Sequence, residues 1–342
     1  MLDDLKYIHQ RDSQDAFGIA EKQATQLTQK FEVPAIRGVF ENIVYGGMGG
    51  SALAALISQS WPGYKLPFEV CRQYHIPAYV SDKTLFIACS YSGNTEETIS
   101  ALQEAEAKGA RIVVIAGGGK LQEIAQQKRH TFVLLPKAAQ PRYAVFYNLA
   151  AFLAVLESAK LADAENIDAE LRMASEFLQQ AVQSWIPTVP TAQNPAKRLA
   201  QEIVGKSAVI YGGPLMAPIA YKWKISFNEN AKNVAWWGQY SEFNHNEFIG
   251  WSSHPVNKPY AVIDLRSNLE HERIQKRFEL SDRMLSGRRP AAQVVQAEGQ
   301  TLPQQLLWTS NFGDFVTLYV AMLNNVDPGP VDLVEEFKKK LG

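Results

Sequence analysis

Residues 43–51 read IVYGGMGGS, and this stretch decides the fold class. Its apolar start is typical of a short buried strand, and its glycines allow a tight turn into the helical sequence ALAALISQ. Because parallel strands need a crossover between them, usually a helix, such a junction favours a parallel sheet. Further apolar strands are predicted at residues 84–89, 111–115 and 131–135. We therefore expect the first half of the chain to be α/β.

The same rhythm starts again in the second half. Residues 207–213 read SAVIYGG and echo IVYGG at residues 43–47, and further strands are predicted at 261–265 and 292–295. Each YGG leads into a helical segment, which indicates two similar domains and a gene duplication. The predicted fold class is α/β, with two doubly wound domains, each a mostly parallel sheet flanked by helices.

Helical and proline-rich sequences separate the two domains. Residues 145–186 are helical in pattern, and three prolines within residues 187–195 are typical of a linker. The predicted divisions are an N-terminal helical segment over 1–37, a first domain over 38–155, a helical connection and proline-rich linker over 156–196, and a second domain with a C-terminal helix over 197–342.

Length and composition describe an ordinary globular protein. The 342 residues suit two domains, and 46% hydrophobic with 20% charged residues excludes a disordered or fibrous chain. A formal charge of -1 gives no electrostatic footprint for nucleic acid or an anionic membrane. Two cysteines cannot form a disulfide framework in a chain of this size, which favours a reducing compartment. With a charged N-terminus and no long apolar stretch, the expected location is the cytoplasm.

The glycine-rich turn after the first strand is a candidate anion site. Backbone N–H groups at Gly49 and Gly50 can approach an anion closely, and Ser51 adds a hydroxyl at the start of the helix. Two other interpretations fit this turn alone. Residues 47–52 match the dinucleotide fingerprint G-x-G-x-x-A, with Glu69 in the place of a ribose-binding acid. A tight turn without any ligand would have the same sequence.

A second turn favours a phosphate over a dinucleotide. After the strand at 84–89 the chain reads SYSGNT, which puts Ser90, Ser92 and Thr95 around a glycine at another strand-to-helix junction. Several neutral hydroxyl donors can surround phosphate oxygens without a metal, whereas a dinucleotide does not need them at this strand. Capping of the helix that begins at Glu96 is the plainer interpretation, but a cap needs one hydroxyl and three are present. Two such turns at adjacent strand ends predict a phosphomonoester site.

These turns, together with motifs in the second half, resemble a known family. GGMGGS followed by SYSGNTEET is similar to the sugar isomerase (SIS) domain, whose doubly wound α/β fold binds phosphosugars through such turns. Three segments of the second half resemble signatures of the bifunctional phosphoglucose/phosphomannose isomerase family. They are FNENAKN at 227–233, EFNHNEFIGW at 242–251, and DPGP at 327–330 before a lysine-bearing helix. The resemblance covers roughly residues 40–342 and implies two SIS-type domains.

The resemblance implies an aldose–ketose isomerase of glycolysis and gluconeogenesis. It would interconvert glucose 6-phosphate and fructose 6-phosphate, with mannose 6-phosphate as a further substrate, through a metal-free cis-enediol. Moving a proton between the two carbons needs a base, and a carboxylate in a partly dry pocket suits this task. The family carries its proton-shuttling glutamate where this chain has Glu229. By itself, Glu229 would read as an exposed acid near a helix end.

Three cationic or titratable residues complete the implied site. Arg142 matches the family's Pro-Arg step and would stabilise the enediol, because a guanidinium does not lose its proton. His245 would move the proton of the ring oxygen, since its pKa lies near neutrality, and Lys338 would assist it. Without the resemblance these residues read as a surface charge, a structural histidine and a helix cap. The spacing of the C-terminal lysines leaves Lys339 as an alternative to Lys338.

The resemblance also bears on partners and cofactors. In the family the histidine extends into the site of the neighbouring subunit, which implies a homodimer in which His245 serves the partner's site. The six histidines of the chain are scattered without ligand spacing, so we expect no metal, and the chemistry requires no organic cofactor. Sugar phosphates are the implied small-molecule partners, and neither nucleic acid nor a membrane is expected.

One departure from the family concerns mannose. The family has a small threonine shortly before the C-terminal lysine, linked to room near C1 and C2 of the sugar, but residues 327–337 contain no threonine. Val331 lies near that place, and valine keeps the room while lacking the hydroxyl. Two further interpretations stay open at this point. One is an SIS isomerase of another sugar phosphate, such as a pentose or amino sugar phosphate, and the other is a non-enzymatic sugar-phosphate sensor.

Overall fold

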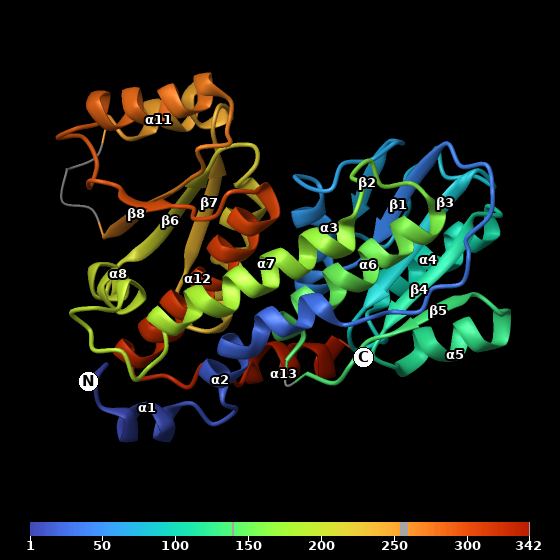
Figure 1. The fold of residues 1–342 in the computed structure, drawn as a ribbon, viewed down its shortest axis with the longest axis horizontal. Coiled ribbons are helices and arrows are strands. Elements are labelled where there is room, and N and C mark those ends of the chain that lie inside the picture. The colour runs from blue at the N-terminus through green and yellow to red at the C-terminus, as the bar shows by residue number, and fades with distance from the viewer. Residues whose placement is uncertain (139, 254–258, 342) are drawn as a thin grey trace. The chain divides into compact units, whose positions relative to one another are not determined.

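Parallel pairing of short buried strands organises both halves of the chain (Figure 1). The computed structural model describes residues 1–138, 140–253 and 259–341. The chain divides into two compact units: the first unit is Gln23–Glu176, and the second unit combines Met1–Lys22 with Phe177–Gly342. The chain therefore begins and ends in the second unit, and the first unit is an insertion in its sequence.

The first unit is built on a five-stranded sheet in which every pair of neighbours is parallel. Its elements are η1 (Gln23–Thr28), β1 (Asn42–Gly46), α3 (Gly49–Ser58), β2 (Phe68–Cys71), β3 (Thr84–Ser90), α4 (Glu96–Ala107), β4 (Arg111–Ala116), α5 (Gly119–Lys128), β5 (Thr131–Leu134), η2 (Pro141–Ala144), α6 (Val145–Ala159) and most of α7 (Ile167–Ala181).

Helices cover both faces of this sheet, whose strand order is β2-β1-β3-β4-β5 (Figure 1). One face packs against α4 and α5 through apolar residues such as Phe86 and Val114. On the other face, Tyr45 of β1 packs edge-on against Phe152 of α6, with ring centroids 4.9 Å apart. The central strand β3 is buried at every position because it is covered on both faces.

The second unit carries a four-stranded parallel sheet in the order β7-β6-β8-β9. Its elements are α1 (Leu5–Arg11), α2 (Ala16–Lys22), η3 (Val182–Ser184), α8 (Pro195–Ile203), β6 (Ser207–Gly212), α9 (Ala217–Glu229), β7 (Ala235–Gln239), η4 (Glu242–His245), α10 (Glu247–Gly250), β8 (Tyr260–Arg266), α11 (Glu272–Met284), β9 (Gln293–Gln296), α12 (Leu302–Leu323) and α13 (Asp332–Leu341).

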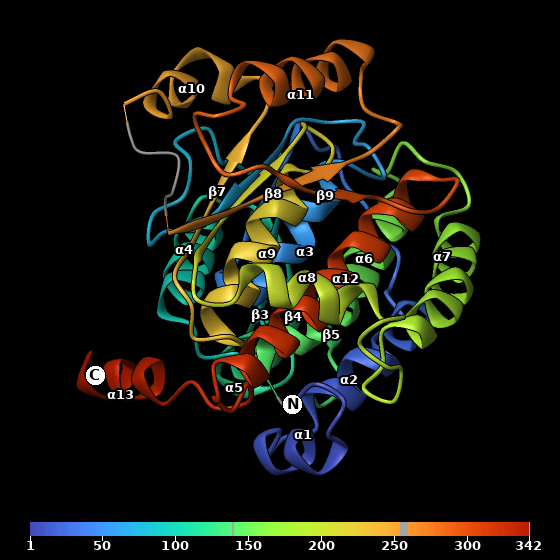
Figure 2. The same ribbon diagram turned by 90° about the vertical axis from the view of Figure 1, so that its left-hand side faces the viewer.

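This second sheet is also covered on both sides. Figure 2 shows α10 and α11 on one side of the strands and α8, α9 and α12 on the other. The α11 side has an aromatic core in which Tyr211, Tyr240, Phe243 and Phe278 pack together. The strand order and the parallel pairing repeat those of the first sheet without its outer β5. The predicted α/β class with two doubly wound domains is therefore confirmed.

Seven strands lie where the sequence predicts them, and two were missed. The missed strands are β2 and β7, which form the edges of their sheets beside β1 and β6. Edge strands are only partly buried, so their sequences FEVC and AWWGQ do not show the apolar run of a central strand. In β7, Trp236 and Trp237 are half exposed.

The N-terminal segment is helical in three short pieces, α1, α2 and η1. The carboxylate of Asp12 accepts hydrogen bonds from the backbone N–H groups of Ala16 and Phe17, at 2.7 and 3.0 Å, which starts a new helix after α1. Helical structure ends at Thr28, and Pro34 lies in the extended stretch that follows. The predicted domain boundaries stay a prediction.

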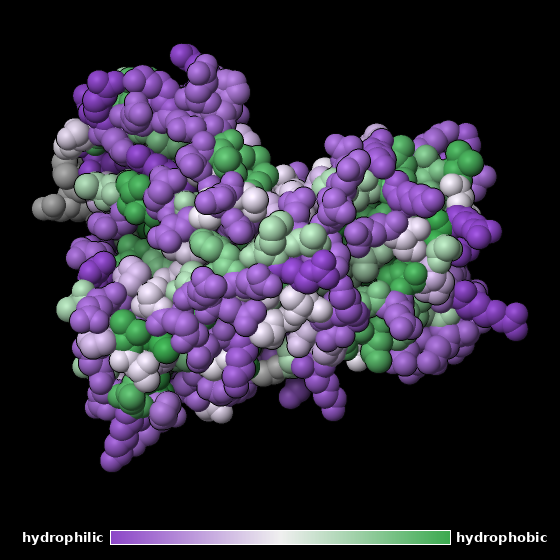
Figure 3. All heavy atoms as spheres, viewed as in Figure 1, coloured by the Kyte–Doolittle hydropathy of each residue, from purple (hydrophilic) through white to green (hydrophobic). Residues whose placement is uncertain are grey.

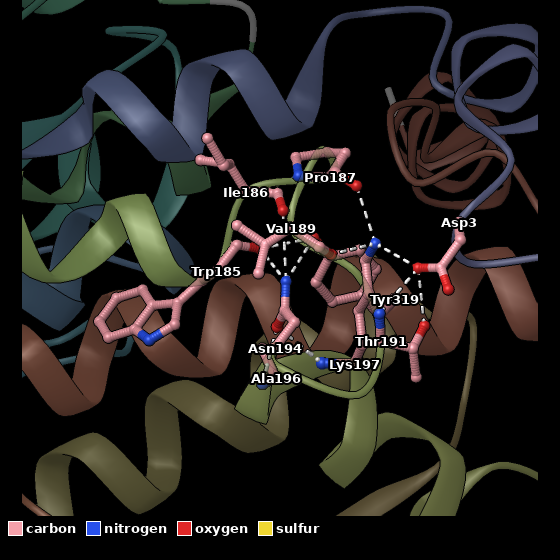
Figure 4. Close-up of polar contacts among 10 residues, drawn as sticks. All are labelled: Asp3, Trp185, Ile186, Pro187, Val189, Thr191, Asn194, Ala196, Lys197 and Tyr319. Carbon is pink, nitrogen blue, oxygen red and sulfur yellow. Dashed lines mark hydrogen bonds and ion pairs between the residues drawn. The ribbon is translucent and has the colours of Figure 1, made fainter.

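The proline-rich loop before α8 is held by one buried lysine (Figure 4). Lys197 is fully buried, and its Nζ donates to the carbonyl oxygens of Pro187 and Val189 at 2.7 and 2.8 Å and pairs with Asp3 at 2.9 Å. Asn194 ties the same loop to Trp185 through a 2.8 Å hydrogen bond from its side-chain amide to the carbonyl. The lysine therefore joins the N-terminus of the chain to residues 185–197 within the second unit.

Among the helices of the described residues, none is both long enough and apolar enough to cross a membrane. The face drawn in Figure 3 is mostly hydrophilic, with apolar residues in small, separate groups.

We expect Lys197→Met to lower the free energy of unfolding by about 3 kcal/mol, because two buried carbonyl groups lose their donor. Asp3→Asn should lower it by less than about 1 kcal/mol, because the Asp3 side chain is 55% exposed and such pairs are weak. Urea unfolding of both variants measures the difference. Equal effects would mean that the ion pair, and not the carbonyl contacts, holds the loop.

Candidate active site

The first sheet changes its direction of winding between β1 and β3. From β1 the chain crosses through α3 to β2 on one side, and from β3 it crosses through α4 to β4 on the other. Such a switch point leaves a crevice at the carboxyl ends of the two strands, which is where ligands bind in open α/β sheets. The glycine-rich turn after β1 and the hydroxyl turn after β3 both lie at this crevice.

The glycine turn brings the start of α3 against the strand-end backbone. The Ser51 hydroxyl accepts a hydrogen bond from the backbone N–H of Tyr91 at 3.0 Å, which joins this turn to the hydroxyl turn after β3. A Cβ on Gly50 would lie 3.1 Å from the carbonyl oxygen of Pro141, so glycine allows α3 to approach η2 closely. At Gly49, where φ is +50°, a Cβ would meet no atom within 4 Å.

The hydroxyls after β3 form one cluster. Ser90 Oγ lies 2.7 Å from Thr95 Oγ1 and 3.4 Å from Ser92 Oγ. Thr95 is the N-cap residue of α4, yet among the described residues its hydroxyl makes no capping hydrogen bond and is paired with Ser90 instead. The plain capping interpretation therefore does not account for the three hydroxyls. Ser90 is buried, while Ser92 is exposed, so the cluster opens from the sheet toward solvent.

A close backbone contact sets the shape of the hydroxyl turn. Gly93 has φ of +72°, and a Cβ there would lie 1.8 Å from the carbonyl oxygen of Gly118. The backbone N–H of Gly93 donates to Ser90 Oγ at 3.2 Å, and its carbonyl accepts from Leu121 at 2.9 Å. Only glycine fits this position, because both the backbone angle and the space exclude a side chain. The sequence showed the glycine, but not its neighbour across the turn.

Arg142 is a buried cation beside the glycine turn. It lies on η2 with 6% of its surface exposed, and its guanidinium carbon is 4.6 Å from the centre of the Tyr143 ring. One of its nitrogens donates to the Tyr143 hydroxyl at 3.3 Å. The close approach of Gly50 to Pro141 and to the backbone nitrogen of Arg142 places the backbone of Arg142 beside the start of α3. A surface charge, the plainer interpretation of Arg142, does not fit its burial.

Cys89 places a buried thiol next to the hydroxyl turn. Cys89, which directly precedes the hydroxyl turn, is buried, and burial raises the pKa of its thiol to about 12. The thiol therefore stays protonated and carries no charge at neutral pH. Among the described residues, no group of three or more His, Cys, Asp or Glu side chains is arranged to hold a metal ion.

At the corresponding turn of the second unit, a carboxylate replaces the open cluster. Glu270 follows β8 as the hydroxyl turn follows β3, and its Oε1 accepts from the backbone N–H groups of Leu215 and Met216 at 2.8 and 3.3 Å. These donors lie at the start of α9, where a bound anion would otherwise be stabilised. A Cβ on Gly213 would lie 2.4 Å from the same oxygen. Burial raises the pKa of Glu270 even though both hydrogen bonds act in the opposite direction.

Glu229 is the last residue of α9 and is half-buried. Its backbone carbonyl accepts a hydrogen bond from Lys232 Nζ at 2.5 Å. The same Nζ donates to the carbonyl groups of Pro328 and Pro330, at 3.2 and 2.7 Å. Lys232 thus fastens the end of α9 to the DPGP segment that leads into α13, a role that its place in FNENAKN did not reveal.

His245 is exposed and lies on a segment that several hydrogen bonds anchor. Tyr211 donates a short hydrogen bond from its hydroxyl to Glu247, and Trp251 donates from its ring nitrogen to the Tyr211 hydroxyl at 3.3 Å. Asn244 donates to Ser281 Oγ at 3.0 Å. Among the described residues, the His245 side chain has no hydrogen bond or ion pair. Its neighbours hold the backbone, and the imidazole is left open to solvent.

The C-terminal lysines lie on α13, all of whose described residues are exposed. Lys338 pairs with Glu335 at 2.8 Å, and Lys340 pairs with Glu336 at 2.6 Å. Lys339 makes no ion pair with any described residue. Val331 directly precedes this helix and is partly buried. These contacts leave the choice between Lys338 and Lys339 open.

The predicted site residues thus fall into two groups. The first unit holds seven of them, with the glycine turn joined to the hydroxyl turn through Ser51 and the backbone of Arg142 beside Gly50, namely Gly49, Gly50, Ser51, Ser90, Ser92, Thr95 and Arg142. The second unit holds the other three on different elements, namely Glu229 on α9, His245 on η4 and Lys338 on α13.

Comparison with known proteins identifies the family. Residues 41–162 match the SIS domain, and residues 192–341 match the bacterial phospho-glucose isomerase C-terminal SIS domain. A bifunctional phosphoglucose/phosphomannose isomerase from Caldicellulosiruptor bescii is 34% identical over 324 residues, which covers 94% of this chain and 95% of the relative. The chain belongs to the bifunctional phosphoglucose/phosphomannose isomerase family.

The chain is also similar, more distantly, to other proteins. A D-glucosamine-6-phosphate 4-epimerase from Sulfolobus acidocaldarius is 30% identical over 233 residues, covering 68% of this chain and 71% of the epimerase. The solved structure of a glucose-6-phosphate isomerase like protein from Thermus thermophilus has the same fold, with a TM-score of 0.66. It is 21% identical and covers 99% of this chain and 98% of that one.

We expect Gly93→Ala to lower the free energy of unfolding by at least about 2 kcal/mol, because a Cβ strains the backbone and collides with Gly118. Gly49→Ala is the matched control, since it has a positive φ and open space and should cost only about 1 kcal/mol. Urea unfolding of the two variants gives the comparison. If Gly93→Ala proves no worse than Gly49→Ala, the contact with Gly118 does not shape the turn.

Proposed function

We propose that this protein is an aldose–ketose isomerase that interconverts glucose 6-phosphate, fructose 6-phosphate and mannose 6-phosphate. Membership of the bifunctional isomerase family supports the reaction and the substrates. The observation that carries the proposal is the cluster of three hydroxyls at the switch point of the first sheet, joined to Ser51 through Tyr91. Such a cluster suits a phosphate ester and leaves the rest of the sugar free for chemistry.

The phosphate is held first. Ser51, Ser90, Ser92 and Thr95 would surround its oxygens with hydroxyl donors, and the backbone at Gly49 and Gly50 would add the positive end of α3. The Ser90–Thr95 contact of 2.7 Å means that one hydroxyl proton is already engaged, so a bound phosphate would reorient it. This anchoring fixes the sugar carbons relative to the protein, which is the positioning that a proton transfer requires.

The proton transfer itself is assigned to a carboxylate and a guanidinium. Glu229 would take the proton from C2 of the aldose and return it to C1, so that no charge is left on the product. Negative charge builds on the enediol oxygens during this step, and a buried guanidinium such as Arg142 stabilises it strongly because burial removes competing water. These groups and the bound phosphate supply what a cis-enediol mechanism needs, so the proposal includes no metal.

Ring opening precedes isomerisation and needs a separate acid and base. His245 would move the proton at the ring oxygen, with Lys338 as its partner and Lys339 as the alternative lysine. The imidazole of His245 is exposed on an anchored segment, which supports a contact with a molecule outside its own subunit. We propose that it acts in the site of the neighbouring subunit of a homodimer.

The mannose reaction depends on room near C1 and C2. Val331 has almost the volume of threonine, so the epimer should fit, while a hydrogen bond from a hydroxyl at this place is lost. One relative is a D-glucosamine-6-phosphate 4-epimerase, so amino sugar phosphates are a second candidate class of substrate. They would bind through the same phosphate-binding hydroxyls.

The decisive assay offers fructose 6-phosphate to the purified protein in the presence of a chelator and follows both aldose phosphates. We expect glucose 6-phosphate and mannose 6-phosphate to appear. Glucose 6-phosphate alone would overturn the mannose half of the proposal and point to the missing hydroxyl at Val331. Neither product would overturn the isomerase, and glucosamine 6-phosphate would then be the substrate to offer.

Glu229→Gln serves as the control variant in this assay. The amide has the size of the carboxylate but cannot take a proton, so turnover should fall by about a thousandfold or more while fructose 6-phosphate still binds. Binding is measured by calorimetry on the same sample. Unchanged turnover in Glu229→Gln would show that another group is the base.

Mixing two inactive variants tests whether His245 serves the partner's site. If each site combines Glu229 of one subunit with His245 of the other, heterodimers of Glu229→Gln and His245→Ala contain one intact site. After unfolding and refolding together, the mixture should regain about a quarter of the wild-type activity, since half of the dimers are mixed and one of their two sites works. No recovery, with dimers confirmed by light scattering, would assign His245 to its own subunit's site.

A further inference from the structure

A second candidate ligand site lies at the amino ends of the strands of the first sheet, whereas the hydroxyl turns lie at their carboxyl ends. There, next to the starting residues of β4 and β5, the surface has an open cavity of about 380 Å³. Cationic residues line it together with an apolar wall, and those that matter are Arg37, Phe40, Arg111, Ile112, Arg129 and His130. A cavity of this size can hold a small metabolite. The isomerase reaction proposed above uses none of these residues.

The charges around the cavity are unbalanced. Arg37, Arg111 and Arg129 are exposed, and with the described residues none of their guanidinium groups makes a hydrogen bond or an ion pair. Asp82 is the acidic residue of the lining and pairs with none of them among the described residues. Three arginines that line one small cavity place like charges in its surroundings, and a bound anion would reduce their mutual repulsion.

The remaining charges near the cavity already have partners. His130 contacts Glu106 through Nε2 at 3.0 Å, and Lys128 pairs with the same carboxylate at 3.8 Å. Glu106 is therefore engaged and does not neutralise the arginines. Within the described part of the chain, the unpaired positive charge of the cavity comes from the three arginines.

An apolar wall limits the kind of ligand. The Phe40 ring is folded back over Gly38, where a Cβ would lie only 2.7 Å from it, and Ile112 is buried beside the opening. A ligand here would have its anionic groups on the arginines and its carbon skeleton against Phe40 and Ile112. Guanidinium groups bind phosphate and carboxylate through paired hydrogen bonds, which suits such a ligand.

We propose that this cavity binds a small polyanion with at least two phosphate or carboxylate groups, separately from the sugar phosphate at the hydroxyl turns. The proposal does not depend on the isomerase reaction, because it rests on the arginines and on the wall of the cavity. It adds a second ligand site to the first unit, at the end of the sheet where the strands begin.

The chain offers a matched pair of variants for the test. Arg129 follows α5 with φ of 58° and ψ of 36°, and Lys160 follows α6 with φ of 59° and ψ of 35°. Both are exposed cations in the left-handed conformation that glycine prefers after a helix, so replacement by glycine leaves each cap intact. Arg129 lines the cavity and Lys160 does not. Arg129→Gly and Lys160→Gly therefore differ in the cavity and are alike in charge and backbone.

Calorimetric titration with inorganic pyrophosphate, in the presence of saturating fructose 6-phosphate, measures the site. We expect Arg129→Gly to weaken pyrophosphate binding by about tenfold, as the loss of a charge-assisted contact does, and Lys160→Gly to change it by less than about twofold. Adding Arg111→Ala to Arg129→Gly should abolish it. Equal binding by the two glycine variants, or no binding by the wild-type protein, would overturn the proposal.

The outcome is separable from that of the proposed function. None of these variants alters the hydroxyl turns, so any pyrophosphate bound there is common to all of them. A protein that fails to isomerise fructose 6-phosphate yet loses pyrophosphate in Arg129→Gly would refute the isomerase and keep this site.

Discussion

The backbone of Gly93 lies against that of Gly118, and the hydroxyl turn of the first unit depends on this contact. It lets the chain turn sharply after β3, so that Ser90 and Thr95 face each other and the start of α4 is left uncapped by a side chain. The hydrogen bond from the Tyr91 backbone to Ser51 then joins the turn after β3 to the turn after β1. A phosphate-sized group of hydroxyls is thus a result of backbone packing and not only of residue type.

The two sheets of the chain share this plan but differ in what occupies it. In the first unit the turn after β3 presents neutral hydroxyls, whereas in the second unit the turn after β8 delivers the carboxylate of Glu270 onto the start of α9. A carboxylate there meets the need for an anion from within the chain. In the second unit, the backbone N–H groups of Leu215 and Met216 at the start of α9 are thus engaged by Glu270.

Much of this arrangement could be predicted from the sequence, because it depends on local patterns. Central strands such as β3 are apolar along most of their length, and the glycines and hydroxyls that follow them indicate the crevice. The edge strand β7 was missed, because Trp236 and Trp237 are half exposed. The contacts of Lys232 with Pro328 and Pro330 and the placing of the Glu270 carboxylate were beyond prediction, since each joins residues that are distant in sequence. The burial of Arg142 was likewise not visible in its local sequence.

The insertion of the first unit into the second has a consequence for biosynthesis. Residues 1–22 leave the ribosome before residues 23–176, but the partners that they pack against, such as Lys197 for Asp3 and Tyr319 for Phe17, are made after them. All five strands of the first sheet come from residues 23–176, so the first unit can fold as soon as residue 176 has emerged. Helices α1 and α2 are therefore made before the first unit but reach their native contacts only after it, when residues 177–342 have been made.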